Sequence, residues 1–185
     1  EPAPLSTLDI GKQRMQTQMP QAERDAWTVR PAEPDDHARI IAVLPDWWDG
    51  RDLTAMVPRV FLLHFHTTSL IVEHGDLLVA FLIGFDSQSY DDEAYIHFAG
   101  VHPEYRGKGI GRSLYERFFE RCRQNRRTVV RACTSPVNVN SIAFHRKMGF
   151  ILEDGGGRIN GIKVFPDYNK PGDHKVRFKI DLDDE

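Results

Sequence analysis

The chain of 185 residues is poor in cysteine. It contains two cysteines: Cys122 falls in an expected helix and Cys133 in an expected strand, so neither a disulfide framework nor a cysteine metal site is indicated. His64 and His66 are two apart, a spacing that does not suit one face of a helix, and no further ligand cluster accompanies them. No metal site is therefore expected.

Long hydrophobic runs and an excess of positive charge are also missing. The longest apolar stretch, residues 77–85, has the length of a strand and is too short to cross a bilayer. The 24 Lys and Arg residues are outnumbered by 27 Asp and Glu residues, whereas binding to a phosphate backbone depends on clustered positive charge. We therefore expect a soluble, cytoplasmic protein with neither a membrane nor a nucleic acid as its partner.

The organisation of the chain changes at Trp27. Residues 1–26 are polar and rich in Gln, and they lack the apolar segment of a signal peptide, so they are interpreted as a peripheral arm. From Trp27 onward the apolar residues recur regularly, and the length suits one sizeable core. A single domain over residues 27–185 is predicted.

Periodicity predicts alternating strands and helices in this domain. The expected strands are 27–32, a hairpin over 69–85 with Gly75 and Asp76 at its turn, 93–101, 128–134, 150–152, 162–165 and 176–182. The expected helices are 38–44, 53–66, one beginning near Gly109 whose apolar residues recur through Cys122, and 139–148. This order predicts a mixed α/β layer fold.

The stretch "HPEYRGKGIGRSL" places Gly107, Gly109 and Gly111 at alternate positions before the long helix. The first backbone N–H groups of that helix lack partners within it, and its dipole favours an anion there. Glycines let the backbone approach such an anion closely, and Arg106 and Lys108 add positive charge. The loop is therefore predicted to bind phosphate, although a glycine-rich surface turn before a basic helix would look similar.

Two common phosphate motifs do not fit this loop. A nucleotide P-loop requires Ser or Thr directly after Gly-Lys, and here Gly109 follows Lys108. The dinucleotide fingerprint requires a third glycine three positions after the second, and Arg112 stands there. Both motifs are excluded.

Two motifs together resemble a known family. Arg106, Gly109 and Gly111 match the acyl-CoA loop of the GNAT superfamily of N-acetyltransferases, which is Arg or Gln, two residues, Gly, one residue, then Gly or Ala. The preceding Val101, Pro103 and Tyr105 match residues that often stand before this loop. A second family motif is similar to "NVNSIAFHRKMGF", residues 138–150.

The resemblance implies a GNAT-like, mostly antiparallel central sheet flanked by about four helices. Its middle strands, 93–101 and 128–134, are expected to splay apart, and the pantetheine arm of acetyl-CoA, the expected co-substrate, pairs with the first. An unpaired N–H near residues 98–101 could stabilise the oxyanion formed during acyl transfer. The implied cofactor-binding residues are Ala99, Gly100, Val101, Arg106, Gly107, Lys108, Gly109, Ile110, Gly111, Arg112, Asn138 and Ser141.

His145 is the expected acid. Asn138, Ser141 and His145 are three and four residues apart, so they share one face of a helix. The resemblance implies that His145 occupies a position usually held by a tyrosine that protonates the leaving thiolate; a helix histidine without a role is the alternative. Glu93 and His97 are candidate bases for deprotonating the amine, or simply solvated residues of a strand.

Trp47 and Trp48 are candidate acceptor-binding residues. They lie in "PDWWDG", residues 45–50, in the expected link between the first two helices, which borders the acceptor pocket in the family. An ammonium group can bind to the faces of such rings. The alternative is that both rings simply pack in the core.

Two functions follow from these motifs. The first is an acetyl-CoA-dependent N-acetyltransferase that transfers an acetyl group to a primary amine of a small molecule or peptide by direct attack on the thioester. The second is a non-catalytic acyl-CoA-binding sensor or partner module. Either a monomer or a homodimer is compatible with the sequence.

Overall fold

The computed structural model describes residues 27–182, so the predicted arm over residues 1–26 lies outside it. A seven-stranded sheet with the strand order β1-β2-β3-β4-β5-β9-β6 runs through this part of the chain. Its strands are β1 (Thr28–Pro31), β2 (Leu70–His74), β3 (Leu77–Asp86), β4 (Glu93–Val101), β5 (Val129–Thr134), β6 (Ile151–Leu152) and β9 (Val176–Asp181). All neighbouring pairs are antiparallel except β4 and β5, which are parallel.

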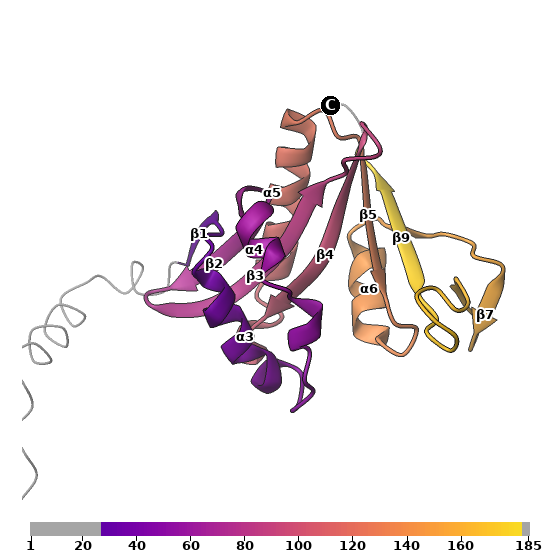
Figure 1. Cartoon of the computed structure of the whole chain (residues 1–185), viewed down its shortest axis with the longest axis horizontal. Helices are drawn as coiled ribbons and strands as arrows, with labels where there is room; N and C mark the ends of the chain where they lie inside the picture. The colour runs from indigo at the N-terminus through magenta and orange to yellow at the C-terminus, as the bar shows by residue number, and fades with distance from the viewer. Residues whose placement is uncertain (1–26, 183–185) are drawn as a thin grey trace, which may run out of the picture.

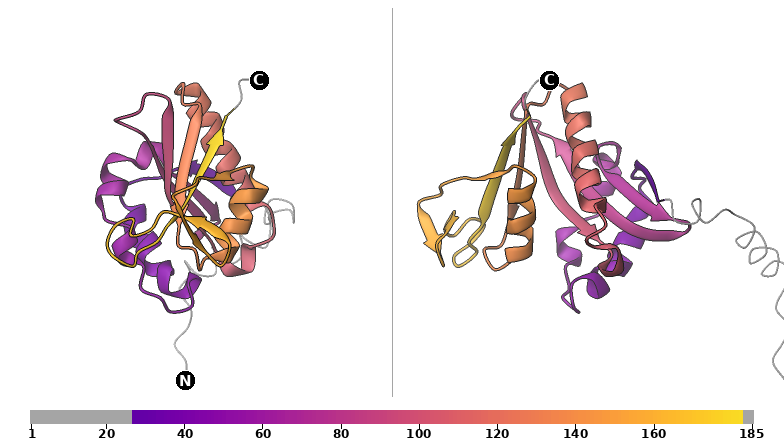
Figure 2. Two further views of the ribbon diagram at one scale, coloured as in Figure 1. Left: turned by 90° about the vertical axis from the view of Figure 1, so that its right-hand side faces the viewer. Right: turned by 180° about the vertical axis from the view of Figure 1, so that it is seen from behind.

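Within residues 27–182, four α-helices cover the two faces of the sheet: α3 (Asp36–Trp47), α4 (Val60–His64), α5 (Ile110–Gln124) and α6 (Val139–Lys147). One layer of the core contains side chains of α5 and α6, and the other contains those of α3 and α4. The two views in Figure 2 show the sheet with these layers on either side. The predicted mixed α/β fold with a mostly antiparallel sheet and about four helices is confirmed.

The middle of the sheet opens into a V. Residues 93–96 of β4 pair with residues 129–132 of β5, but the pairing of these two strands stops there. Beyond that point β4 continues to Val101 against β3, and β5 continues to Thr134 against β9. Figure 1 shows β4 and β5 diverging toward α3 and α6. The predicted splay of the middle strands is therefore present.

A bulge in β4 marks the start of the opening. Ile96 pairs with Gly84 and Phe98 pairs with Ile83, which leaves His97 as an extra residue without a partner in the register. Such an extra residue bends its strand and increases the local twist. The bulge thus coincides with the point where β4 leaves β5.

The single helix expected over residues 53–66 is wrong. The chain forms a 3-10 turn (Thr54–Met56), then α4, then a second 3-10 turn (His66–Thr68). Pro58 lacks an N–H and disfavours a helical conformation in the residue before it, and Val57 has φ −126° and ψ 62°. The first helix is also longer than expected, because α3 continues through Pro45 to Trp47.

The start of α3 is held by a buried carboxylate. Asp36 is 3% exposed and contacts Arg30 of β1 at 2.7 Å and Arg39 of its own helix at 3.0 Å. Glu73 of β2 binds the same two arginines. Burial opposes the charge on Asp36, but the hydrogen bonds from Arg30 and from the Glu33 N–H lower its pKa overall. This network fixes α3 against the edge of the sheet and so positions its far end.

The remaining strands form a separate hairpin, β7 (Gly157–Ile159) with β8 (Ile162–Val164). Strand β7 was not expected from the sequence. Over residues 27–182, no helix combines the length and the apolar character that crossing a membrane requires.

Candidate active site

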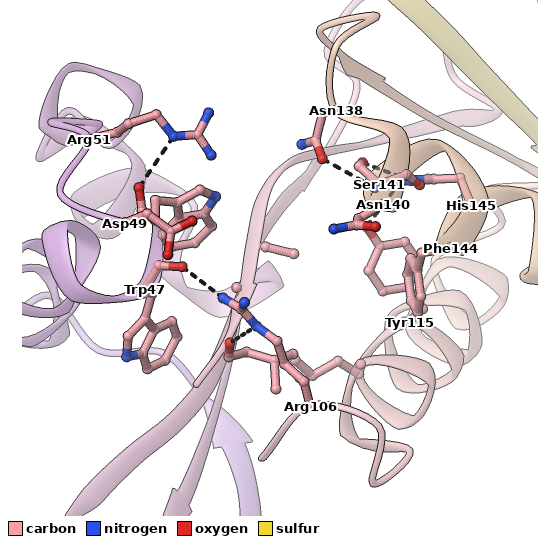
Figure 3. Close-up of a pocket in the computed structure, with 16 residues that line it drawn as sticks. Trp47, Asp49, Arg51, Arg106, Tyr115, Asn138, Asn140, Ser141, Phe144 and His145 are labelled. Carbon is pink, nitrogen blue, oxygen red and sulfur yellow. Dashed lines mark hydrogen bonds between the residues drawn. The ribbon is translucent and has the colours of Figure 1, made fainter. Parts of the chain in front are cut away.

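A cavity of about 400 Å³ lies beside the unpaired end of β4. Figure 3 shows its two walls: the end of α3 with the following loop on one side, and the start of α6 on the other. Its lining residues are Trp47, Trp48, Asp49, Arg51, Ala99, Gly100, Val101, Arg106, Gly111, Leu114, Tyr115, Asn138, Asn140, Ser141, Phe144 and His145.

The unpaired end of β4 directs backbone groups into this opening. The His102 N–H donates to the Val79 carbonyl of β3 at 2.8 Å, so residue 102 faces β3. Because backbone direction alternates along a strand, Val101 and Ala99 present their N–H and C=O groups to the other side. The Val101 carbonyl indeed accepts a hydrogen bond from Arg106 there. An extended ligand that contains amide groups can therefore pair with this edge of β4 in the place of a neighbouring strand.

The glycine loop has the geometry of an anion site. Gly107 and Gly109 have φ values of 78° and 85°, and a Cβ added to either would meet no atom within 4 Å. Gly109 is the N-cap of α5, and no side chain among residues 27–182 caps the first N–H groups of this helix. The first N–H groups of α5 are thus available to a phosphate, which fits the co-substrate implied by the sequence.

The predicted cofactor-binding residues fall into two groups. Ala99, Gly100, Val101, Arg106, Gly111, Asn138 and Ser141 line the cavity, while Gly107, Lys108, Gly109, Ile110 and Arg112 form the adjoining loop and first turn of α5. Asn138 is the N-cap of α6, because its Oδ1 accepts from the Ser141 N–H at 3.2 Å. The cavity thus joins the two sequence motifs.

Arg106 is held by the protein itself. Its Nε donates to the Val101 carbonyl at 3.1 Å, and Nη2 donates to the Trp47 carbonyl at 2.7 Å. The side chain therefore ties the end of α3 to the end of β4 at one side of the cavity (Figure 3). The guanidinium that the sequence suggested as positive charge for a phosphate is thus already bonded to two backbone carbonyls.

His145 is buried in the wall of the cavity, with 6% of its surface exposed. Its ring lies parallel to that of Phe178 on β9, with centroids 4.1 Å apart. Burial lowers the pKa of His145 to about 4, although the hydrogen bond with the Ser141 carbonyl acts in the opposite direction. The ring is therefore neutral at pH 7.

The hydrogen bonds of His145 define its tautomer. Nδ1 lies 2.8 Å from the Ser141 carbonyl oxygen, which can only accept, so Nδ1 carries the proton. Nε2 then accepts from the hydroxyl of Tyr115 on α5 at 3.2 Å. Burial also raises the pKa of Tyr115. The result is a neutral tyrosine–histidine pair in the wall of the cavity.

Trp47 and Trp48 differ in their surroundings. Trp47 is 3% exposed and stacks on Phe81 with centroids 5.7 Å apart, so its ring belongs to the core. Trp48 is half-buried and stacks on Phe98 at 5.1 Å. A Cβ added to Gly100 would lie 2.6 Å from the Trp48 ring, so the ring packs directly on the β4 backbone. Trp48 is the better placed of the two to meet a ligand.

Neither predicted base lines the cavity. Glu93 makes two contacts of 2.8 Å with Arg131 and lines a separate cavity near the start of β4. His97, the bulged residue, stacks on Phe61 with centroids 4.0 Å apart, and its Nε2 bonds the Met56 carbonyl at 2.7 Å. Burial lowers the pKa of His97, so it is neutral at pH 7.

Several lining residues were not proposed from the sequence. They include Asp49, Arg51, Tyr115, Asn140 and Phe144. Tyr115 carried a usable signal, because it is four residues after Gly111 and so shares its helix face. Elsewhere in residues 27–182, no three His, Cys, Asp or Glu side chains gather as metal ligands would.

A comparison with known protein families gives a match that covers the elements that form the cavity. The model of the Acetyltransferase (GNAT) family matches residues 37–150, which is more than half of the chain. This range includes α3 except its first residue, the splayed strand β4, the glycine loop and α6.

Curated relatives match over shorter stretches. An L-methionine sulfoximine/L-methionine sulfone acetyltransferase of Salmonella typhimurium is 31% identical over 85 residues, which are 45% of this chain and 50% of the relative. An L-2,4-diaminobutyric acid acetyltransferase of Vibrio cholerae is 34% identical over 58 residues, 31% of this chain and 34% of the relative. The matched stretches thus span half or less of each of these relatives.

Solved structures share the fold over most of the chain. Ard1 from Thermoplasma volcanium superposes with a TM-score of 0.67 at 20% identity, covering 86% of this chain and 99% of that one. The yncA protein of Salmonella typhimurium, solved with acetyl-CoA, gives a TM-score of 0.63 at 20% identity, with 87% and 96% covered.

Proposed function

This chain belongs to the acetyltransferase (GNAT) family, and we propose that it is an N-acetyltransferase that transfers the acetyl group of acetyl-CoA to a primary amine of a small molecule or peptide. Acetyl-CoA is the co-substrate in this family. The observation that carries the proposal is the continuity of three features: the uncapped start of α5, the unpaired edge of β4 and the cavity between the loop after α3 and α6.

In the proposed complex, the pyrophosphate binds the backbone N–H groups of residues 107–112. The pantetheine arm pairs with the Ala99 C=O and the Val101 N–H, which face the opening. This pairing uses the position of a neighbouring strand, so it satisfies backbone groups that β5 leaves unpaired. Asn138 and Ser141 line the other side of the arm.

The reaction balances without a further reactant. The amine nitrogen attacks the thioester carbonyl carbon, the carbon–nitrogen bond forms and the carbon–sulfur bond breaks. The amine loses one proton and the departing thiolate gains one, so the products are an amide and a free thiol. The Ala99 N–H is the proposed donor to the carbonyl oxygen as negative charge develops there.

For the leaving group, we propose that His145 acts as a neutral positioning residue. Because the Nδ1–H of His145 donates a hydrogen bond to the Ser141 carbonyl, His145 cannot supply a proton directly to the thiolate. The Tyr115 hydroxyl has one proton, which Nε2 of His145 accepts in the free protein, and we propose that this O–H turns to donate to the thiolate as the thiolate forms. Tyr115, which lies on α5, thereby has the role toward the leaving thiolate that the family resemblance implied for position 145.

For the amine, His97 is the stronger of the two proposed bases. It stands in the bulge directly before the unpaired part of β4, and its neutral ring can accept a proton at Nδ1 because Nε2–H is bound by Met56. The negative charge of Glu93 is already balanced by its ion pair with Arg131. Since His97 does not line the cavity, the proposal requires a water molecule that carries the proton from the amine to His97.

The non-catalytic acyl-CoA-binding module is the second candidate. It is favoured by the burial of His145 and by the absence of Glu93 and His97 from the cavity lining. Such a module would bind acyl-CoA at the glycine loop and in the cavity, but its side chains would not be arranged to transfer protons.

Thiol release separates the two candidates. The full chain is incubated with acetyl-CoA and a panel of the standard amino acids, methionine sulfone, 2,4-diaminobutyrate, short peptides, and simple mono- and polyamines. The panel includes the substrates named for the relatives above. An acetyltransferase releases free thiol with at least one amine, at a rate proportional to enzyme. Acetyl-CoA binding by calorimetry without amine-dependent thiol release would indicate the binding module instead.

A further inference from the structure

The charged side chains that line the cavity differ in the hydrogen bonds and ion pairs that they make. Three charged side chains line it: Asp49, Arg51 and Arg106. Arg106 is committed to two backbone carbonyls. Asp49 and Arg51 make no ion pair with any residue in the described range 27–182, and they are not paired with each other. The cavity therefore exposes one carboxylate and one guanidinium to a ligand.

The loop after α3 orients these two side chains. Asp49 has φ 54° and Gly50 has φ 78°, and a left-handed conformation is uncommon for a residue with a side chain. Residues in such conformations persist where the surrounding structure holds them, as at ligand sites. Two consecutive left-handed residues reverse the chain tightly. Asp49 and Arg51 consequently line the same cavity, although they are only two residues apart.

The guanidinium of Arg51 is fixed at one end and open at the other. The Arg51 backbone N–H donates to the Trp48 carbonyl at 3.1 Å, and its Nε donates to the same oxygen at 3.3 Å. The Nη groups extend from this anchor toward Asn138 on the opposite wall (Figure 3). Two parallel N–H donors of this kind match the two oxygens of a carboxylate.

The opposite wall adds neutral donors. Asn138 uses its Oδ1 to cap α6, which leaves its amide N–H groups for a ligand. The side-chain amide of Asn140 also lines the cavity and has no hydrogen bond within residues 27–182. A carboxylate between Arg51 and these amides would receive hydrogen bonds from both walls.

We propose that the acceptor is a small amine that carries a carboxylate, such as an amino acid with a free α-carboxyl group, and that Arg51 binds this carboxylate. Asp49 and the face of Trp48 accommodate the ammonium group before it is deprotonated. The inference rests on the proposed acetyltransferase function, of which it specifies the substrate class.

The same guanidinium could instead meet a phosphate of the co-substrate. The proposed phosphate site is built from the backbone N–H groups of residues 107–112, at the start of α5, whereas Arg51 belongs to the loop after α3. We therefore assign Arg51 to the acceptor. The two assignments predict different kinetic effects, so one experiment separates them.

The experiment compares matched acceptors and matched variants. The best acceptor from the thiol-release panel is assayed beside its carboxamide and its decarboxylated amine, with wild type, Arg51→Gln, Asp49→Asn and Arg59→Gln. Arg59 is an exposed arginine a short distance along the chain that does not line the cavity, so Arg59→Gln is the control. Acetyl-CoA affinity is measured by calorimetry for each variant.

The wild type should favour the carboxylate over the carboxamide by at least about tenfold in kcat/KM, about 1.4 kcal/mol. Arg51→Gln should reduce that preference to below about threefold while leaving acetyl-CoA affinity within about twofold. Asp49→Asn should lower kcat/KM for all three acceptors, since the ammonium is common to them, and Arg59→Gln should change nothing.

Three results would overturn the inference. They are a best acceptor without a carboxylate, a carboxylate preference that survives Arg51→Gln, and a loss of acetyl-CoA affinity in Arg51→Gln that accounts for its kinetic defect. In each case thiol release continues, so the acetyltransferase function stands. If wild type releases no thiol with any amine, the proposed function itself has failed, and the inference fails with it.

Discussion

The rings of His145 and Phe178 lie face to face, with centroids 4.1 Å apart and planes inclined by 1°. Phe178 is fully buried on β9, so this contact places a titratable ring from α6 inside the core. The contact also explains why His145 is neutral, because an imidazolium there would lose its hydration.

The first prediction concerns stability and pH. The pKa of His145 falls from 6.5 to about 4 on folding, so the unfolded chain binds more protons than the folded one between these values. The free energy of unfolding should therefore decrease as the pH falls through this window, by about 2 to 3 kcal/mol from this residue between pH 7.5 and 4.5. Urea unfolding at both pH values measures the change.

A matched pair of variants isolates this contribution. His145→Gln should remove it, giving a shallower pH dependence than wild type, whereas His64→Gln, at an exposed position, should keep the wild-type dependence. Carboxylates titrate in the same range, but they contribute equally to all three proteins. Identical slopes for wild type and His145→Gln would show that His145 is not held neutral by burial.

The second prediction concerns the departing thiolate. If the Tyr115 hydroxyl donates to it, Tyr115→Phe should lower kcat by roughly a hundredfold with little change in acetyl-CoA affinity. Because burial raises the pKa of Tyr115, the wild-type kcat should not fall on the alkaline side between pH 6 and 9. A poor acceptor should be used so that chemistry limits the rate. An alkaline limb between pH 6 and 8 that vanishes in His145→Gln would restore His145 as a charged acid.

The third prediction concerns Arg106, whose two hydrogen bonds link Val101 and Trp47. Arg106→Met should release the end of α3 from β4, which raises the acceptor KM more than the dissociation constant of acetyl-CoA, since backbone groups supply the phosphate contacts. Arg117→Met, at an exposed position on α5, is the control. A loss confined to acetyl-CoA affinity would mean that Arg106 leaves its carbonyl partners to bind the co-substrate.

The fourth prediction concerns the packing of Trp48 on Gly100. A Cβ at this glycine would lie 2.6 Å from Trp48 and 2.9 Å from Phe81, so Gly100→Ala should destabilise the protein by about 1 to 3 kcal/mol. Part of this cost should disappear when Trp48 is replaced by Ala, because one of the two clashing rings is then gone. A double-mutant cycle from chemical denaturation measures the coupling. Strict additivity would show that Trp48 does not pack on Gly100 in solution.

The fold was largely predictable because its signals are local. The apolar repeat of α5, the alternation in β4 and the glycines between them are short-range patterns, and the structure confirms these elements. Two misses were also local in origin. Pro58 breaks the expected second helix, and Asn160-Gly161, a strong hairpin signal, joins β7 to the strand β8 that had been expected alone.

The site was less predictable because its decisive contacts are distant in sequence. The sequence motifs located the glycine loop and the residues of α6, but not the environment of His145, which is set by Phe178 and Tyr115. Arg106 and Trp47 are 59 positions apart, and no periodicity relates them. Asp49-Gly50 is a sequence signal for a turn with positive φ, but it does not show that Arg51 after the turn lines the same cavity as Asn138.

The most direct test of the central claim is a calorimetric titration of acetyl-CoA into wild type, Gly109→Val and Gly156→Val. Gly109 and Gly156 have φ values of 85° and 84° and open space around a Cβ, so the two substitutions introduce the same backbone strain. Gly109 alone stands at the start of α5, where the phosphate is proposed to bind. We predict that Gly109→Val weakens acetyl-CoA binding at least tenfold while Gly156→Val retains the wild-type affinity. Equal affinities for acetyl-CoA in all three folded proteins would contradict the account.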